Sequence, residues 1–86
     1  MSQLLEQRYA VYRVDVLTAE CEPLAETPYF GEAIRWLDAP WELLDDVRRT
    51  RFTRLDGTGM PIAIVEDLLG RISVLCIHPV RGFANA

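Results

Sequence analysis

Apolar residues fall on both parities of two short runs in the second half of the chain, at residues 60–65 and 72–77. Both runs are rich in β-branched side chains, which favour strands. The turn signal Asp56-Gly57-Thr58-Gly59 precedes the first run, and Leu68-Leu69-Gly70 separates the two. Glycine reaches positive φ without strain and aspartate accepts hydrogen bonds from backbone amides, so the first signal predicts a hairpin. With the segment before the turn, the pattern predicts a three-stranded meander whose second apolar face is covered by the chain itself or by a partner subunit.

In the first half of the chain, residues 8–18 alternate between apolar and polar positions. Four apolar residues share one parity: Ala10, Tyr12, Val14 and Val16. This alternation predicts a half-buried strand with Arg13 and Asp15 on its polar side. Residues 20–23 end the strand, because Pro23 cannot donate a ladder hydrogen bond and the neighbouring glutamates prefer water.

Two helices are expected next. Thr27-Pro28 predicts a helix start, since the threonine oxygen can accept a free amide bond and proline fixes the first helical φ. This helix runs to about Asp38, and its apolar face comprises Phe30, Ala33, Ile34 and Leu37. A second helix is predicted from Pro40 to Arg48, with an apolar stripe of Trp41, Leu44 and Val47.

These elements predict a small α+β domain with the order β-α-α-β-β-β. A parallel sheet would need alternating βαβ units, so we expect an antiparallel or mixed four-stranded sheet with both helices on one face. Residues 1–86 then form one domain, in which residues 1–7 are assigned to no element and residues 79–86 are a flexible tail. A chain of 86 residues buries only about 60–65% of its unfolded surface, so self-association would supplement a modest core.

The charge of the chain restricts its partners. Thirteen acidic and nine basic residues give a formal charge of −4, which opposes nonspecific binding to nucleic acid or to an anionic membrane. No apolar run reaches transmembrane length and no signal-peptide pattern is present, so we expect a cytoplasmic protein. Two cysteines are too few for a disulfide framework, and we expect reduced thiols.

A cluster of arginines surrounds Phe52: Arg48, Arg49, Arg51 and Arg54. Basic residues around an aromatic ring can hold phosphates and stack a base, so a nucleic-acid-associated accessory role is one alternative. On a strand, however, Arg49 and Arg51 point to one side while Phe52 and Arg54 point to the other. A solvated surface paired with nearby acids is the simpler interpretation.

A soft-metal or thiol site is a remote alternative. Cys76 and His78 are two residues apart on a predicted strand, so both leave the same face, and Cys21 could join them. The spacing supplies three ligands at most and includes no CxxC pair. A cysteine within an apolar strand is more often a core residue.

Five acids could in principle serve as paired carboxylates for catalysis or hard-metal binding: Glu20, Glu22, Glu26, Asp45 and Asp46. The sequence does not indicate the burial that would separate their pKa values, so a solvated surface is favoured. The same acidic surplus also fits docking onto a basic partner.

The two tryptophans complete the candidates. Trp36 lies at the margin of the apolar face of the first helix, where it either completes the core or faces another chain. We therefore interpret the chain as a small acidic protein-interaction or regulatory module that self-associates, with Trp36, Trp41, Arg49, Arg51 and Arg54 as its candidate interaction residues. We assign no catalytic, cofactor or metal residue, and an enzyme is less favoured than a binding module.

Overall fold

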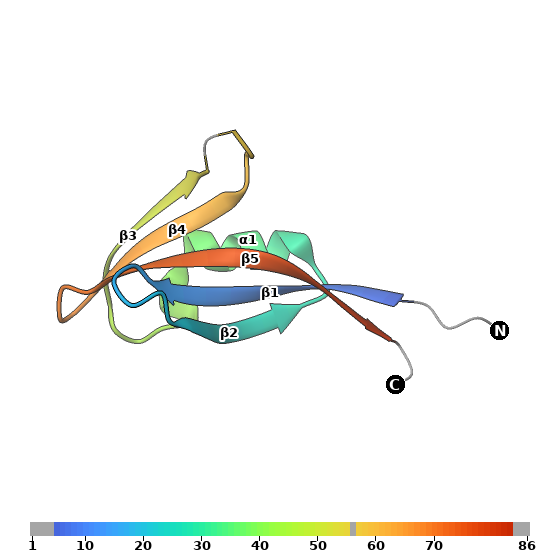
Figure 1. Cartoon of the computed structure of the whole chain (residues 1–86), viewed down its shortest axis with the longest axis horizontal. Coiled ribbons are helices and arrows are strands. Elements are labelled where there is room, and N and C mark those ends of the chain that lie inside the picture. Colours follow the sequence, from blue (N-terminus) through green and yellow to red (C-terminus); the bar gives the residue numbers. More distant parts are fainter. Residues whose placement is uncertain (1–4, 56, 84–86) are drawn as a thin grey trace.

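The computed structural model describes residues 5–55 and 57–83, and in these residues the chain forms one five-stranded antiparallel sheet with a single short α-helix (Figure 1). The strands are β1 (Leu5–Asp15), β2 (Cys21–Thr27), β3 (Val47–Arg54), β4 (Pro61–Asp67) and β5 (Ile72–Phe83). Their order across the sheet is β2-β1-β5-β4-β3, and each neighbouring pair is antiparallel. The helix α1 (Phe30–Asp38) and a single 3-10 turn, η1 (Pro40–Glu42), connect β2 to β3.

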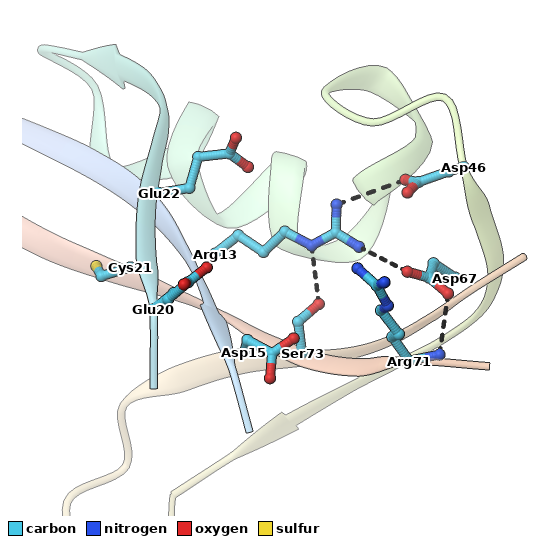
Figure 2. A pocket seen from close by; sticks show the side chains of 9 residues that line it. All are labelled: Arg13, Asp15, Glu20, Cys21, Glu22, Asp46, Asp67, Arg71 and Ser73. Atoms are coloured by element: carbon cyan, nitrogen blue, oxygen red, sulfur yellow. Dashed lines mark hydrogen bonds and ion pairs between the residues drawn. The ribbon is translucent and has the colours of Figure 1, made fainter. Parts of the chain in front are cut away.

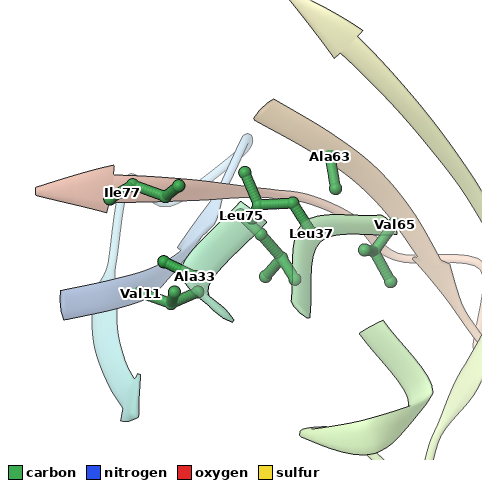
Figure 3. Packing of buried hydrophobic residues seen from close by; sticks show 7 residues of the cluster. All are labelled: Val11, Ala33, Leu37, Ala63, Val65, Leu75 and Ile77. Carbon is green, nitrogen blue, oxygen red and sulfur yellow. The ribbon is translucent and has the colours of Figure 1, made fainter. Parts of the chain in front are cut away.

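Helix α1 covers one face of the sheet and builds the core there (Figure 3). Ala33 and Leu37, one turn apart on the helix, are fully buried. Below them lie side chains of alternate residues on the three central strands: Val11, Ala63, Val65, Leu75 and Ile77. Each large side chain buried in this way contributes about 1.5–3 kcal/mol to folding.

The opposite face, which we call the helix-free face, is covered by no described helix or strand. Its side chains come from the other parity of the central strands: Tyr12, Val14, Ile64, Val74 and Cys76. All five are half-buried, because each is flanked by cross-strand neighbours such as the Ile64–Val74 pair. The apolar runs of β4 and β5 are thus covered by the chain's own helix on one face only.

The predicted order β-α-α-β-β-β and its four-stranded sheet are wrong, first because the structure contains the additional strand β2. Its first residues, Cys21, Glu22 and Pro23, belong to the segment 20–23 that the sequence predicts to end the first strand. However, β2 is an edge strand, where a missing amide proton faces solvent, and a β-bulge opposite Val11 and Tyr12 accommodates Leu24 as the extra residue.

The second predicted helix, from Pro40 to Arg48, is also wrong. Only Pro40–Glu42 is helical, as η1, and Val47 already begins β3. Asp45 and Asp46 would lie near the C-terminus of such a helix, where negative charge is unfavourable, and Val47 and the residues after it favour a strand. Leu43 and Leu44 still pack against the core, from a loop instead of a helix.

The meander predicted in the second half is confirmed: β3, β4 and β5 are consecutive antiparallel neighbours. The first helix ends at Asp38 as predicted, although it begins at Phe30, with Thr27 instead closing β2 and accepting a hydrogen bond from the Tyr29 amide at 3.1 Å.

In the first strand, the side chains that face the helix are not those that the alternation predicts to be buried together. Strand β1 covers Leu5–Asp15, and Tyr9 and Val11 face the helix, while Ala10 and Tyr12 belong to the helix-free side. Both parities carry apolar residues, so alternation could not identify the helix side.

The expected tail at residues 79–86 divides into two parts. Strand β5 continues to Phe83 and pairs with the beginning of β1, with Pro79 opposite Tyr9, while residues 84–86 lie outside the described residues. Beyond Cys76, β5 pairs with β1 alone among the described residues, so the other side of β5 carries no described strand and a proline can be accommodated.

Within the described residues, no helix has the length and apolar character that a membrane crossing requires.

Candidate protein-binding surface

Two hairpin turns lie side by side at one end of the sheet, the left end in Figure 1. One joins β1 to β2 and the other joins β4 to β5. Because β1 and β5 are antiparallel neighbours with Asp15 opposite Ser73, the end of β1 lies beside the start of β5. The Val16 amide donates to the Ile72 carbonyl at 3.2 Å, which links the two turns directly.

Each turn is organised by the aspartate that ends its first strand. Asp15 Oδ1 accepts hydrogen bonds from the amides of Leu17 and Thr18, at 2.8 and 3.0 Å. Asp67 Oδ1 accepts from the amides of Leu69 and Arg71, at 2.8 and 2.9 Å. One residue in each turn has a positive φ, the left-handed backbone conformation: Ala19 in the first turn and Gly70 in the second. Both turn backbones are therefore fixed by bonds within the chain.

These backbone hydrogen bonds also hold both carboxyl groups in the ionised state. The Thr18 and Leu17 amides lower the pKa of Asp15. The Arg71 amide is the main cause of the lowered pKa of Asp67; desolvation opposes it, while the Leu69 amide and the Arg13 charge add to it. Near neutral pH both groups are carboxylates, so neither serves as a proton donor.

Apolar side chains project from these fixed turns. We call them the apolar tip: Val16, Leu17, Leu68, Leu69 and Ile72, with exposed fractions from 37% for Ile72 to 91% for Leu17. Single exposed apolar residues are common, but four on two adjacent turns, with Ile72 at the start of β5, form a patch of the kind that marks interaction sites. Sequence patterns miss this feature, since the alternation over residues 8–18 predicts Leu17 within a strand and Leu68-Leu69 stands between two apolar runs.

A polar pocket of about 270 Å³, the acidic pocket, includes the two turn aspartates among its lining residues (Figure 2). It is lined by Arg13, Asp15, Glu20, Cys21, Glu22, Asp46, Asp67, Arg71 and Ser73. Five carboxylates and two guanidinium groups give it a formal charge of −3. The carboxylates of Glu20 and Glu22 form no hydrogen bond or ion pair with any residue in the described part of the chain.

The mostly buried side chain of Arg13 lines the acidic pocket on the helix side of β1. Its Nε donates to Ser73 Oγ at 3.0 Å, and its two terminal nitrogens lie 3.5 Å from Asp46 Oδ1 and 3.7 Å from Asp67 Oδ2. Only 17% of the side chain is exposed. The positive charge of Arg13 is thus neutralised inside the molecule, and the remaining carboxylates determine the charge seen from outside.

A second groove, of about 490 Å³, adjoins the acidic pocket through Arg13, Glu22 and Asp46. It is lined in addition by Leu24, Trp41, Glu42, Leu43, Leu44 and Asp45. Trp41 is 60% exposed at its margin, and Glu42 is paired with Arg35 of α1. The groove therefore combines a partly apolar wall with acidic groups.

The other sequence candidates lie elsewhere. Trp36 is half-buried and packs against the core, unlike Trp41. In β3, Arg49 and Arg51 are exposed opposite Glu66 and Ile64, on the helix-free side, whereas Phe52 packs against the core. Four arginines thus form no single patch.

Two of these arginines have local partners. Arg48 lies 3.8 Å from Glu66, and Arg54 donates to the Gly59 carbonyl at 2.8 Å across the β3–β4 turn. Their positions are explained by contacts within the hairpin.

The thiol and histidine candidates lie on or beside the helix-free face. Cys21 pairs with Val14 and Cys76 with Tyr12, and the His78 ring meets the Tyr12 ring edge-on, with centroids 5.9 Å apart. Burial, with a smaller contribution from Cys21, raises the pKa of the Cys76 thiol, which makes it a poorer nucleophile. Among the described residues, no group of three or more His, Cys, Asp or Glu side chains is arranged to hold a metal ion.

Comparison with protein-family models, curated proteins and solved structures gave no match to this chain.

Proposed function

We propose that this chain is a small protein-interaction module that binds its partner through the apolar tip. The observation that carries the proposal is the exposure of four large apolar side chains on two adjacent turns, and of Ile72 at the start of β5, where Asp15 and Asp67 fix the turn backbones. A rigid turn loses little conformational entropy when it is bound, so its exposed apolar area is available for binding.

The free energy available from the tip is moderate. Complete burial of one large apolar side chain is worth about 1.5–3 kcal/mol, so five partly exposed ones supply roughly 5–10 kcal/mol. Association itself costs about 4–15 kcal/mol. The tip alone supports weak binding, as expected of a reversible regulatory contact.

The test uses the double variant Leu17→Ser/Leu69→Ser, with Leu55→Ser as the matched control. Leu55 is also an exposed leucine, at 49%, but it lies beside the β3–β4 turn at a different place in the fold. Proteins captured from the source lysate by the unchanged chain are expected to be retained by Leu55→Ser and lost by the double variant. Equal capture by all three chains would contradict the proposal.

A second candidate is the self-association expected from the sequence, for which the helix-free face supplies the specific observation. Its half-buried apolar side chains have no described element over them. A cytoplasmic location stays a prediction from the sequence.

A further inference from the structure

We infer that the partner recognised by the apolar tip is a basic amphipathic helix, whose apolar stripe covers the tip while its lysine or arginine side chains enter the acidic pocket. This inference rests on the proposed function, and it adds the chemistry of the partner.

The first argument is the contiguity of the two surfaces. Asp15 and Asp67 line the acidic pocket, and the tip begins with the residue that follows each of them, Val16 and Leu68. Ile72 follows Arg71 and precedes Ser73, which also line the pocket, although its own side chain leaves the opposite face of β5 from Ser73. A partner that covers the two turns, with Leu17, Leu68 and Leu69, therefore has its flank beside the carboxylates. An amphipathic helix places apolar and charged side chains side by side in this way.

The second argument is that the charge of the pocket is not satisfied within the described chain. Glu20 and Glu22 have no described partner, and Arg13, the buried cation, is already shared among Ser73, Asp46 and Asp67. The two turn aspartates are ionised near neutral pH, as ordinary aspartates are, and their lowered pKa values keep them ionised into the acid range. The pocket thus offers the carboxylates of Glu20 and Glu22 to a cation from outside, and each new exposed pair adds a modest gain.

The third argument is that burial of the tip alone supplies too little free energy for tight binding. The free energy gained by burying the tip is nearly offset by the free-energy cost of association, so a partner without basic residues would bind weakly. The adjoining groove extends the cation-binding surface, since Trp41 can contact a lysine or arginine through its ring face beside Asp45 and Asp46.

The same charge argues against other occupants. An anionic membrane would meet the acidic pocket as soon as the tip approached its surface, and two copies joined tip to tip would place two acidic pockets near each other. Charge complementarity selects a cationic protein segment.

The experiment measures binding of three labelled 18-residue peptides by fluorescence anisotropy. The first is a helix of leucine and lysine in amphipathic order, the second replaces each lysine by glutamate, and the third replaces each leucine by serine. We expect the leucine–lysine peptide to bind, with weaker binding at higher salt, and the other two to bind at least about tenfold more weakly.

Charge variants of the chain test whether the leucine–lysine peptide binds the acidic pocket itself or responds only to the net negative charge of the chain. Glu20→Gln/Glu22→Gln should weaken binding of the leucine–lysine peptide by about threefold to tenfold, whereas Arg71→Gln, which removes a cation from the pocket wall, should strengthen it. Glu32→Gln is the control, since Glu32 lies on α1 outside the pocket. An effect of Glu32→Gln as large as that of Glu22→Gln alone would overturn the inference.

The two proposals fail in different ways. If the leucine–glutamate peptide or phosphatidylserine vesicles bind as well as the leucine–lysine peptide, and Leu17→Ser/Leu69→Ser removes that binding, the basic partner is wrong and the apolar tip stands. If the leucine–lysine peptide binds equally to the unchanged chain and to Leu17→Ser/Leu69→Ser, the tip itself is wrong.

Discussion

At the scale of single residues, Arg13 joins three elements. Its guanidinium group, on β1, contacts Ser73 of β5, Asp67 of β4 and Asp46 of the loop before β3. The side chain is mostly buried, so water screens these contacts less than it screens surface pairs. Arg13 therefore connects β1 to β5, to β4 and to the loop before β3.

We predict that Arg13→Met lowers the free energy of unfolding by about 1–3 kcal/mol. Methionine keeps the apolar stem, but Ser73 loses its donor and two carboxylates lose their cation. Urea unfolding followed by tryptophan fluorescence measures the change. Arg49→Met removes a charge from an exposed position and should change stability by less than about 0.5 kcal/mol. Equal effects of the two variants would mean that the contacts of Arg13 contribute little.

At the scale of elements, the two hairpin turns have the same hydrogen-bond arrangement. In each, an aspartate accepts hydrogen bonds from two backbone amides of the residues that follow it. Such an acceptor favours the ionised carboxylate, which is why the pKa values of Asp15 and Asp67 are lowered. In the unfolded chain these bonds are absent. Each carboxylate thus stabilises the fold above the ordinary aspartate pKa, and this stabilisation is lost as pH falls through the lowered value in the folded state.

We predict that the melting temperature of the unchanged chain falls as the pH drops below about 4. Asp15→Asn/Asp67→Asn should have a lower melting temperature at neutral pH and a flatter pH profile, because its turns no longer titrate. Circular dichroism at several pH values measures both. Asp38→Asn, at the end of α1, should keep the unchanged profile. A double variant with the unchanged slope would show that other groups cause the acid sensitivity.

The accuracy of the sequence predictions also differs between elements. The β3–β5 meander and the end of α1 were predictable because local turn signals and an uninterrupted 3.6-residue period point to one structure. Strand β2 was not, since Pro23 disfavours a strand locally and only its place at the sheet edge permits it. The apolar tip was hidden for a similar reason: exposure of Leu17 and Leu69 depends on turns whose geometry becomes clear only after the strands are paired.

At the scale of the whole molecule, one helix covers a five-stranded sheet in the described residues, so the fold has two unequal faces. The helix side holds every member of the main core cluster, while on the helix-free face Ala10 and Ile62 are buried and five further side chains, those of Tyr12, Val14, Ile64, Val74 and Cys76, are half-exposed. Packing two such faces together would give each sheet a second layer, as in a sandwich of aligned sheets. This geometry leaves the turn residues Leu17, Leu68 and Leu69 of the apolar tip, beyond the end of the paired strands, available to a different partner.

We predict that the unchanged chain forms a dimer through the helix-free face and that Ile64→Glu makes it monomeric. Ile64 lies on this face opposite Arg51, so a glutamate there can pair with Arg51 in the isolated fold, while in a face-to-face dimer the carboxylate would be buried among apolar side chains. Light scattering at high micromolar concentration measures the mass, and circular dichroism checks that the variant is folded. Leu55→Glu, at an exposed position beside the β3–β4 turn, should keep the dimer. A monomeric mass for the unchanged chain would contradict self-association, and a folded Ile64→Glu dimer would place the contact on another surface.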